Sequence, residues 1–320
     1  MIDEELTGRA ETISKAIEDL MPIVHPTGLY QASRHLVDAG GKRLRPSMLL
    51  IAAEAVGGDP LALVSAAVSI ELIHNFTLIH DDIMDNANIR RGRQSVHKIW
   101  GDSGAILAGD TLYSKAFQIL GRTPVEPRLI LESMNILSQT CTAICEGQWL
   151  DLEFENRFRV SEDEYIEMIE KKTGVLYGAS ARMGATLSGA PAEVAKGLDE
   201  FGKLTGMGFQ IHDDVLDLTA PEQVLGKRRG GDLVEGKKTL IMIHALEHSV
   251  EVDVFGKKDA TPQEIERTLS ILEKSGSIEY ARSRAANLVN RGKSALDVLS
   301  DSPAKRLLLE LADYMIKRGY

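Results

Sequence analysis

Apolar residues recur along most of this 320-residue chain with the spacing of an α-helix. Residues 11–21 place Ile13, Ile17 and Leu20 on one helical face, and residues 264–276 repeat the pattern. No stretch of the sequence shows the alternation of polar and apolar residues that is typical of a half-buried strand. Aromatic residues make up only 5% of the sequence and apolar residues 43%, a composition that suits helices. The spacing therefore predicts an all-α fold of about ten helical segments.

The breaks between these segments are short. Turn-forming residues mark them at 40–41, 57–60, 121–127 and 189–193. Because none of the breaks is a long linker rich in Pro, Ser or Gly, we expect a single domain over residues 1–320. Residues 219–238 are the exception, with an expected polar loop of about 20 residues, and loops of this length inside a domain are usually functional.

The charge balance argues against one class of partner. The formal net charge is −10, whereas nucleic-acid-binding proteins usually carry a net basic domain. The first ten residues are acidic and lack an apolar signal segment, which predicts a cytoplasmic protein. The longest apolar stretch, residues 61–70, is closed by Glu71 and falls short of the roughly 20 residues that a membrane span requires. We therefore expect no membrane span.

The sequence contains two cysteines, Cys141 and Cys145, which are too few for a disulfide framework. Their spacing of four places both on one face of a helix. We expect both to pack in the core of a protein from a reducing compartment.

Two near-identical strings, IHDDIMD and IHDDVLD, carry three aspartates each. On a helix, Asp81 and Asp85 lie one turn apart, roughly 6 Å along the axis, and Asp213 and Asp217 repeat that spacing. A single string of this kind is usually a solvated acidic face, but the recurrence favours a shared role. Two such faces would offer the hard oxygen ligands that suit Mg²⁺, which usually completes its coordination with water and substrate phosphate.

The basic residues of this acidic chain gather in short groups near glycines. These groups contain Lys42, Arg43 and Arg45, then Arg90 and Arg91, and then Lys171 and Lys172. Each group alone could be ordinary surface charge. Together they suggest oxyanion sites, because Arg and Lys side chains pair with phosphate oxygens. With the carboxylates and Mg²⁺, they predict a diphosphate substrate.

The charged motifs also follow one another in an order that is typical of a known protein family. From the N-terminal side they read GGKRLRP, LIHDDIMDNANIRRG, GQWLD, KTG, GFQIHDDVLD and GKRRGGD followed by EGKKTL. Their order and spacing resemble those of the trans-isoprenyl diphosphate synthases, specifically the short-chain farnesyl and geranylgeranyl diphosphate synthases. The resemblance runs nearly end to end. It implies one large bundle of mostly antiparallel helices around a central cavity, two Asp-rich helices facing each other, and a homodimer.

The resemblance assigns the metal residues by position. It implies about three Mg²⁺ in the active site. One group of residues binds these ions, and a second group supports the ions and their waters. The binding group is Asp81, Asp85 and Asp213, and the supporting group is Asp82, Asp214 and Asp217.

The resemblance also implies two diphosphate sites. The isopentenyl diphosphate residues are Lys42, Arg45, His74 and Arg91. The allylic diphosphate residues are Arg90, Lys172, Thr173, Gln210, Lys227 and Lys237. The implied catalytic residues are Lys172, Thr173 and Gln210, with the oxygens of Thr173 and Gln210 near the reacting carbons. The implied reaction is ionisation of the allylic diphosphate, attack by isopentenyl diphosphate and loss of a proton, while the long polar loop closes over the site.

Product length is expected to depend on the residues just before the first Asp-rich motif. Phe76 and Thr77, an aromatic residue followed by a small one, resemble the archaeal-type geranylgeranyl synthases and predict a C20 product with Phe76 as the stop. Plain core packing is the alternative for Phe76. A farnesyl or bifunctional C15/C20 synthase is the alternative for the product, and a terpene cyclase or a catalytically silent subunit is more distant.

Two further strings have ordinary explanations. The string HALEH places His244 and His248 one turn apart but lacks the Glu of a zinc-protease helix, so both are expected to be ordinary helix residues. The string GKLTG at 202–206 matches a membrane dimer motif in a helix that is too polar for a membrane, and we expect close helix packing there.

Overall fold

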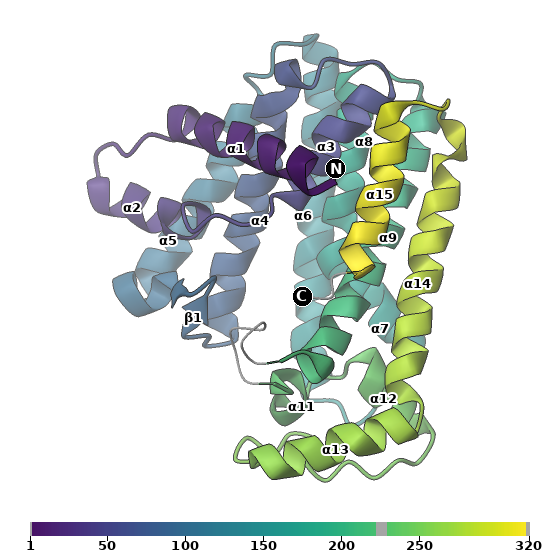
Figure 1. Cartoon of the computed structure of the whole chain (residues 1–320). Helices are drawn as coiled ribbons and strands as arrows, with labels where there is room; N and C mark the ends of the chain where they lie inside the picture. The colour runs from purple at the N-terminus through teal and green to yellow at the C-terminus, as the bar shows by residue number, and fades with distance from the viewer. Residues whose placement is uncertain (1, 222–228, 318–320) are drawn as a thin grey trace. The chain divides into compact units, whose positions relative to one another are not determined.

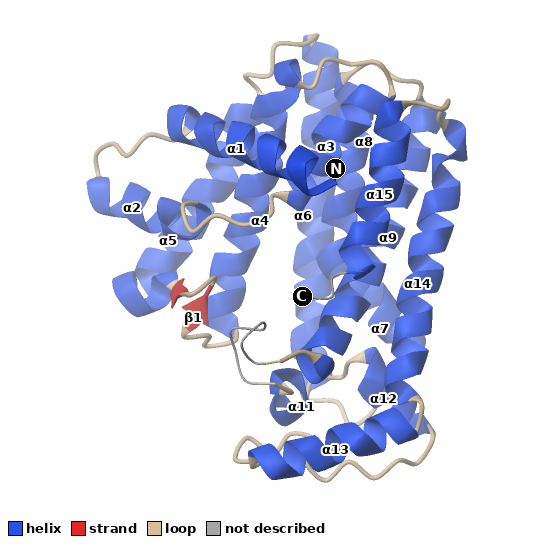
Figure 2. Ribbon diagram, in the orientation of Figure 1, coloured by secondary structure: helices blue, strands red, loops and turns tan. Residues whose placement is uncertain are grey.

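The structure is a computed structural model of the chain, and it describes residues 2–221 and 229–317. Nearly all regular structure in these ranges is helical (Figure 2). The exception is one antiparallel pair of two-residue strands, β1 (Ile89–Arg90) and β2 (Arg93–Gln94). The predicted all-α fold is confirmed.

Contacts along the chain divide it into two compact units. The first unit contains Met1–Cys141, Ala179–Asp199 and Val298–Glu310, and the second contains Thr142–Gly178, Glu200–Asp297 and Leu311–Tyr320. Each unit is described below by itself, and the single domain over residues 1–320 stays a prediction.

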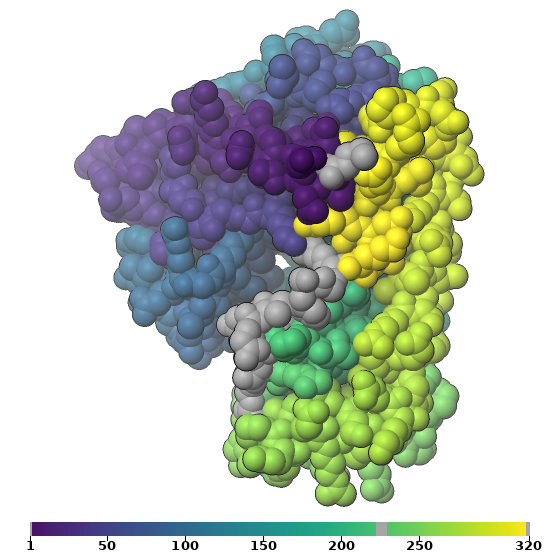
Figure 3. Space-filling view, in the orientation of Figure 1, coloured from purple at the N-terminus to yellow at the C-terminus, as the bar shows by residue number. Residues whose placement is uncertain are grey.

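The first unit is organised around two long helices that pack side by side, α4 and α5. Its helices are α1 (Ile2–Leu20), α2 (Thr27–Val37), α3 (Leu44–Ala55), the 3₁₀ turn η1 (Leu61–Leu63), α4 (Val64–Met84) and α5 (Val96–Leu120). Helix α2 packs against α5, while α1 and α3 pack against α4 (Figure 1). In the space-filling view, the purple α1 and α2 lie over the outer face of this unit (Figure 3).

Helix α4 is the most buried element of the first unit. Ile70, Leu72 and Ile73 are fully buried, and so is the polar Asn75. The helix continues for 13 residues beyond Glu71, so this charge lies inside the helix and does not end it. Among the described residues, Leu61–Met84 is long and apolar enough to cross a membrane, but 61% of its most apolar window is buried in the protein, as in a core helix.

The second unit has its own hydrophobic core. It contains α7 (Glu162–Ile169), the π-helical turn η2 (Glu170–Gly174), α11 (Gly231–Glu235), α12 (Leu240–Glu247), α13 (Pro262–Lys274), α14 (Ser277–Ala295) and the 3₁₀ turn η3 (Leu296–Val298), which ends at the unit boundary. The helices α6 (Pro127–Glu155), α8 (Val175–Leu187), α9 (Ala192–Thr219) and α15 (Pro303–Lys317) have residues in both units. Tyr165, Ile211 and Leu272 lie in the core of the second unit.

Local sequence signals explain where its helices begin. Ser161 caps α7 and Thr261 caps α13, and each forms a capping box with the glutamate three residues later, Glu164 or Glu264. Pro262 follows the second cap at the first helical position, where its missing N–H costs nothing. These two helices therefore begin where the sequence satisfies their first backbone donors.

The string GKLTG is confirmed as a close packing site. A Cβ added at Gly202 would lie 2.4 Å from the carbonyl oxygen of Tyr177, and one at Gly206 would lie 2.6 Å from the Tyr177 ring. Only a residue without a side chain lets α9 approach α8 this closely.

Two expectations were wrong in part. Residues 219–238 are not all loop, because the short helix α11 forms where Leu233 and Val234 bury their side chains. Left-handed glycines flank this helix, with φ of 72° at Gly230 and 81° at Gly236. Of the two cysteines, only Cys141 is buried, and Cys145 is exposed. Both cysteines lie on one helix, α6, as predicted, but Cys145 lies on the exposed side of that helix.

Candidate active site

The first Asp-rich motif lies at the end of α4. Asp81 is partly buried in the last turn, and Asp85 is exposed as the residue that caps the helix. The Asp85 N–H donates to the Asp81 carbonyl over 2.8 Å, so the two residues are one helical turn apart, as predicted. The first unit thus presents two carboxylates near each other at a helix end.

Asp82 points into the protein, where its side chain is 1% exposed. Its Oδ1 accepts hydrogen bonds from Arg90 Nε (2.8 Å) and forms an ion pair with Arg90 Nη2 (2.6 Å). Its Oδ2 is buried and has no hydrogen-bond partner among the described residues. Arg90, expected at the allylic diphosphate, is therefore held by an aspartate of the metal motif in this structure.

The donor set fits a hard divalent cation. Asp81 and Asp85 offer carboxylate oxygens, the ligands that Mg²⁺ prefers, and a buried oxygen of Asp82 lies in the same turn. Within the described ranges, no three His, Cys, Asp or Glu side chains come together as a ready-made metal site. Mg²⁺ usually binds proteins through one or two carboxylates, with water and phosphate oxygens completing the shell.

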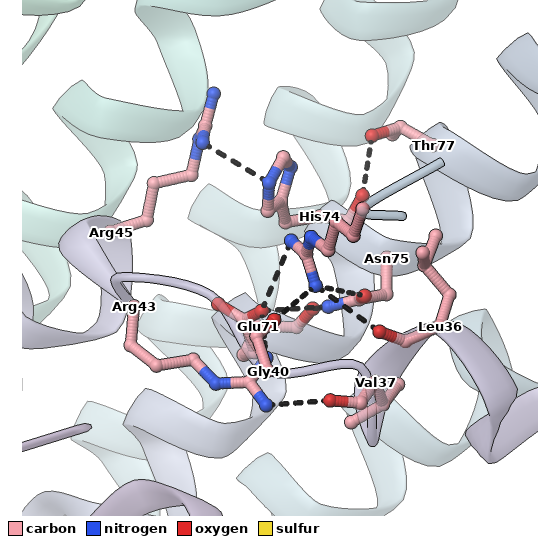
Figure 4. Close-up of polar contacts among 10 residues, drawn as sticks. Leu36, Val37, Gly40, Arg43, Arg45, Glu71, His74, Asn75 and Thr77 are labelled. Atoms are coloured by element: carbon pink, nitrogen blue, oxygen red, sulfur yellow. Dashed lines mark hydrogen bonds and ion pairs between the residues drawn. The ribbon is translucent and has the colours of Figure 1, made fainter. Parts of the chain in front are cut away.

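A second group in the first unit collects arginines around one buried carboxylate (Figure 4). Glu71 of α4 is 2% exposed and forms a short ion pair with Arg43, itself 3% exposed. Asn75 Nδ2 donates to Glu71 Oε1 over 2.7 Å, and Arg43 Nη2 donates to the Val37 carbonyl over 2.7 Å. Both partners of this buried charge pair therefore gain a further hydrogen bond, while Arg43 Nε has no hydrogen-bond partner among the described residues.

Arg91 is fixed against the turn that precedes α3. Its Nη1 donates to the Gly40 carbonyl (2.6 Å), the Leu36 carbonyl (3.2 Å) and Asn75 Oδ1 (3.2 Å), while its Nη2 lies 4.0 Å from Glu71 Oε1. A Cβ on Gly41 would come within 3.3 Å of the guanidinium carbon, and Gly41 has a φ of 130° that favours glycine. The glycines of GGKRLRP therefore let the chain wrap around Arg91.

His74 and Arg45 lie next to this cluster, with Arg45 Nη1 3.3 Å from His74 Nε2 (Figure 4). Burial, assisted by the charges of Arg45, Arg91, Arg43 and Arg90, lowers the pKa of His74 well below 6.5. A neutral His74 that accepts from Arg45 at Nε2 carries its proton on Nδ1. Burial also lowers the pKa of Arg91, against the opposing effect of Glu71.

The structure thus brings together three of the four residues expected at isopentenyl diphosphate. Arg45 contacts His74 directly, and Arg91 reaches the same helix turn through Asn75. Lys42, the fourth, is exposed in the turn between Gly41 and Arg43.

The residues expected to set product length face α5. The Phe76 ring packs edge-on against His80 (4.8 Å between centroids) and against Tyr113 of α5 (5.4 Å). The Thr77 hydroxyl donates to the His74 carbonyl over 2.8 Å. Phe76 is partly buried and takes part in aromatic packing, and its role in product length stays a prediction.

The second Asp-rich motif lies on α9 in the second unit. Asp214 accepts from the Tyr165 hydroxyl (2.7 Å) and from Gln210 Nε2 (3.0 Å). Burial raises the pKa of Asp214 to about 8, and the charge of Asp232 adds to the shift. Asp217 is buried, and its Oδ2 accepts from the Asp232 N–H over 3.1 Å. Asp213, directly before Asp214, is partly buried.

The predicted catalytic residues Lys172 and Thr173 lie on the π-helical turn η2. Lys172 Nζ lies 2.6 Å from Asp151 Oδ2, and the Thr173 hydroxyl donates to Gln210 Oε1 over 3.1 Å. A Cβ on Gly147 would lie 2.3 Å from the Lys172 backbone nitrogen, so α6 can pass this turn only at a glycine. Single π turns inside helices occur frequently at functional sites.

Lys237, a further residue expected at the allylic diphosphate, follows α11. Lys237 Nζ lies 3.6 Å from Asp232 and 3.5 Å from Glu235. Lys227, expected beside it at the allylic diphosphate, lies outside the described residues.

Comparison with known proteins assigns the chain to a family. The sequence model of polyprenyl synthetase matches residues 26–272, more than half of the chain. The chain belongs to the polyprenyl synthetase family. It is 57% identical to a geranylgeranyl diphosphate synthase of Methanosarcina mazei over 317 residues, which cover 99% of this chain and 98% of the relative. It is 46% identical to a geranylfarnesyl diphosphate synthase of Natronomonas pharaonis over 335 residues, which cover 100% and 98%.

A solved structure supports the same family assignment. A geranylgeranyl pyrophosphate synthetase from the archaeon Geoglobus acetivorans matches with a TM-score of 0.94 and 46% identity, covering 98% of this chain and 99% of that one. Members of the family condense isopentenyl diphosphate with allylic diphosphates and use a divalent metal to ionise the allylic diphosphate. This polyprenyl synthetase is therefore a prenyltransferase, and the family resemblance seen in its motifs is confirmed.

Four polar residues of the synthetase site were not predicted from its sequence. They are Glu71, Asn75, Asp151 and Tyr165. A charge that interrupts an apolar helix was a usable signal for Glu71, and Asp151 closes the motif GQWLD. Asn75 and Tyr165 carry no such signal, because each becomes notable only through a partner that is distant in sequence.

Proposed function

We propose that this polyprenyl synthetase makes geranylgeranyl diphosphate by adding isopentenyl diphosphate to dimethylallyl, geranyl and farnesyl diphosphates. The 57% identity with the Methanosarcina mazei synthase over nearly the whole chain supports this product. The observation that carries the condensation is a basic cluster in which Arg43 and Arg91 face Glu71 and Arg45 contacts a neutral His74. A condensing enzyme needs such a second anion site, whereas a terpene cyclase ionises a single diphosphate.

The proposed isopentenyl diphosphate site contains Lys42, Arg45, His74 and Arg91. His74 would donate from Nδ1 to a phosphate oxygen, since its Nε2 already accepts from Arg45. Arg91 Nη2 would exchange its long contact with Glu71, 4.0 Å, for a phosphate oxygen. Because protein oxygens already hold Arg91 Nη1, this guanidinium would bind with little loss of side-chain freedom.

The proposed allylic diphosphate site contains Arg90, Lys172, Lys227 and Lys237, with Thr173 and Gln210 near the reacting carbons. Arg90, Lys172 and Lys237 each lie within 3.6 Å of a carboxylate oxygen in this structure. The incoming diphosphate would replace or share those partners. Lys237 would close over the diphosphate and exclude water from the carbocation, and Lys227, which is expected to act with it, lies outside the described residues.

We propose about three Mg²⁺ per active site, with Asp81, Asp85 and Asp213 as ligands and Asp82, Asp214 and Asp217 supporting them. Bound Mg²⁺ would neutralise the charge that develops on the departing diphosphate. The three supporting aspartates are buried and hold neighbouring groups, Arg90 for Asp82, Gln210 for Asp214 and the α11 backbone for Asp217. They would therefore orient the site more than they would bind metal directly.

Once the allylic diphosphate ionises, the double bond of isopentenyl diphosphate attacks the allylic cation. Thr173 and Gln210 would stabilise that cation through their oxygens, and Lys172 would balance the leaving charge. The proton is then lost, to the departing diphosphate in our proposal, and no Ser, Cys or His nucleophile is required.

The proposed stop for elongation is Phe76, with Thr77 beside it. The aromatic contact with Tyr113 supports this role, since it fixes the Phe76 ring between two helices. A farnesyl or bifunctional C15/C20 product is not favoured, because the relatives above make C20 and C25 chains by their names. A silent subunit is disfavoured because both Asp-rich motifs are intact.

We also propose that the enzyme acts in the cytoplasm as a homodimer, without a nucleic-acid partner or a membrane span. The net charge of −10 supports the lack of a nucleic-acid partner. The burial of most of the apolar window in Leu61–Met84 supports the lack of a span.

The test is incubation of the purified enzyme with labelled isopentenyl diphosphate and each allylic starter, with Mg²⁺ or EDTA, and chromatography of the dephosphorylated products. We expect a C20 alcohol in the presence of Mg²⁺ alone. A C15 or C25 endpoint would overturn the role of Phe76 as a C20 stop. The absence of elongation with every starter would overturn the proposed function.

A further inference from the structure

Four side chains of the second unit form a continuous chain of hydrogen bonds. The Tyr165 hydroxyl donates to Asp214 Oδ2 (2.7 Å), Gln210 Nε2 donates to Asp214 Oδ1 (3.0 Å), and the Thr173 hydroxyl donates to Gln210 Oε1 (3.1 Å). The four residues come from α7, η2 and α9, and Figure 1 shows the places of α7 and α9. Thr173 and Gln210 are the residues proposed to face the reacting carbons, and Tyr165 lies at the far end of the chain.

This chain fixes the direction of the Gln210 amide. The Gln210 Nε2 group donates to Asp214 Oδ1 over 3.0 Å, so the NH₂ group of Gln210 faces Asp214. Its carbonyl oxygen is then turned toward Thr173, whose hydroxyl proton is used in that bond. Both oxygens are left with lone pairs, and neither presents a proton toward the reacting carbons.

Tyr165 is the rigid end of this chain of hydrogen bonds. Its ring is 1% exposed in the core of the second unit, and the capping box of Ser161 and Glu164 fixes the start of its helix. Burial, with the charge of Asp214, raises the pKa of Tyr165 well above 10, so the hydroxyl keeps the proton that it donates. Asp214 therefore receives one hydrogen bond from a side chain that has little freedom to move.

We propose that Tyr165 is a positioning residue for the condensation, which holds Asp214 and, through it, the Gln210 amide so that two oxygens face the allylic cation. The inference rests on the proposed function. Without the Tyr165 hydroxyl, Asp214 can rotate and the Gln210 amide can turn over. The amide would then present N–H groups to a developing positive charge and would raise the barrier to ionisation while leaving diphosphate binding intact.

The first test compares Tyr165→Phe with the wild type in steady-state condensation. We expect kcat to fall about tenfold, the effect of losing one positioning hydrogen bond, with KM unchanged for both diphosphates. Tyr280→Phe is the matched control. The Tyr280 hydroxyl also donates to a carboxylate of the second unit, that of Glu162 (2.5 Å), but this bond is separate from the hydrogen bonds that link Tyr165 to Thr173. Its kcat should equal that of the wild type. An unchanged kcat in Tyr165→Phe, or a rise in KM without a fall in kcat, would overturn the inference.

The second test asks whether Tyr165 acts through Gln210. In a Gln210→Ala background, Tyr165→Phe should cause no further loss of kcat, because the group that it positions is gone. If the two substitutions lowered kcat independently, so that their effects multiplied in the double variant, a positioning role would be contradicted. The three variants should show the same far-UV circular dichroism as the wild type.

A third measurement does not depend on catalysis. In ¹⁵N-labelled enzyme without substrate, the side-chain amide signals of Gln210, assigned by their loss in Gln210→Ala, should be two resolved resonances. In Tyr165→Phe they should shift or broaden, because the NH₂ group samples more than one environment as the amide turns over. Unchanged signals would overturn the inference even if the wild type proved not to condense isopentenyl diphosphate, so its failure can be told apart from failure of the proposed function.

Discussion

Arg45 Nη1 lies 3.3 Å from His74 Nε2, so a guanidinium holds this histidine as a hydrogen-bond acceptor. His74 titrates near 6.5 when unfolded, whereas burial and the arginines lower its folded pKa well below that value. Below about pH 6.5 the unfolded chain therefore binds a proton that the folded protein does not. The stability linked to His74 is present above this pH and is lost as pH falls toward the folded pKa.

We expect the free energy of unfolding to fall more steeply between about pH 7 and about pH 5 in the wild type than in His74→Gln, by about 1 kcal/mol or more. The neutral amide of the variant does not titrate. Urea unfolding at a series of pH values measures this difference. Equal slopes for the two proteins would show that His74 is not held neutral.

Asn75 links Arg91 to Glu71, and its loss should affect one substrate only. In Asn75→Ala, Arg91 Nη1 loses one of its three acceptors and Glu71 loses a donor. We expect KM for isopentenyl diphosphate to rise about three- to tenfold, since one neutral hydrogen bond contributes about 1 kcal/mol, with KM for the allylic diphosphate unchanged.

Ser69→Ala is the matched control for this variant. Ser69 is also fully buried on α4, but within the described part of the chain its hydroxyl bonds only the Ala66 carbonyl of the same helix. Neither KM should change in the control. An equal rise of both KM values in Asn75→Ala would point to general disruption of α4 and against a local role at Arg91.

Gly147 permits the close approach of α6 to the π turn that carries Lys172 and Thr173. A methyl group at this position would lie 2.3 Å from the Lys172 backbone nitrogen, closer than atoms can pack. We expect Gly147→Ala to displace the turn and to lower kcat at least about 100-fold, because small misplacements of reacting groups are costly.

Gly8→Ala is its control, since nothing lies within 4 Å of a Cβ at that helical position. That variant should keep full activity and be slightly more stable, because alanine favours the helix. Steady-state kinetics and thermal unfolding of both proteins provide the check. Full activity in Gly147→Ala would show that the π turn is not part of the site.

Phe76 should determine the product length through its ring. Removing the ring in Phe76→Ala should extend the main product from C20 to C25 or longer, because the contact with Tyr113 is lost. Tyr113→Phe keeps an aromatic ring at 5.4 Å from Phe76 and should still give C20. Chromatography of the dephosphorylated alcohols measures both. A C20 product from Phe76→Ala would leave Phe76 with core packing alone.

The sequence predicted the helices and the helical spacing of the first Asp-rich motif well, because both depend on local pattern. Asp81 and Asp85 are one turn apart as expected, since helical spacing follows from the sequence. The sequence could not predict that Arg90 binds Asp82 or that Lys172 binds Asp151, because such pairs are chosen by the packing of separate segments. The contact between Tyr165 and Asp214 could not be predicted for the same reason, because the two residues lie 49 positions apart.

Burial was the second source of error. The spacing of Cys141 and Cys145 gave the correct helix but not which of them faces solvent, since that depends on the neighbours of α6. Helix α11 was expected as loop because its five residues are too few for a periodic pattern, and its buried Leu233 and Val234 stabilise it instead.

The most direct test of the account is the Mg²⁺-dependent condensation rate of Asp81→Ala and Asp213→Ala, measured in parallel with labelled isopentenyl diphosphate and farnesyl diphosphate. One residue comes from each unit, and each is proposed to bind metal at the same reaction centre. We predict that either change lowers the rate at least about 1000-fold, equivalent to about 4 kcal/mol of barrier, while the exposed Asp110→Ala on α5 keeps the wild-type rate. Turnover close to that of the wild type in either aspartate variant would contradict a metal cluster built from both motifs.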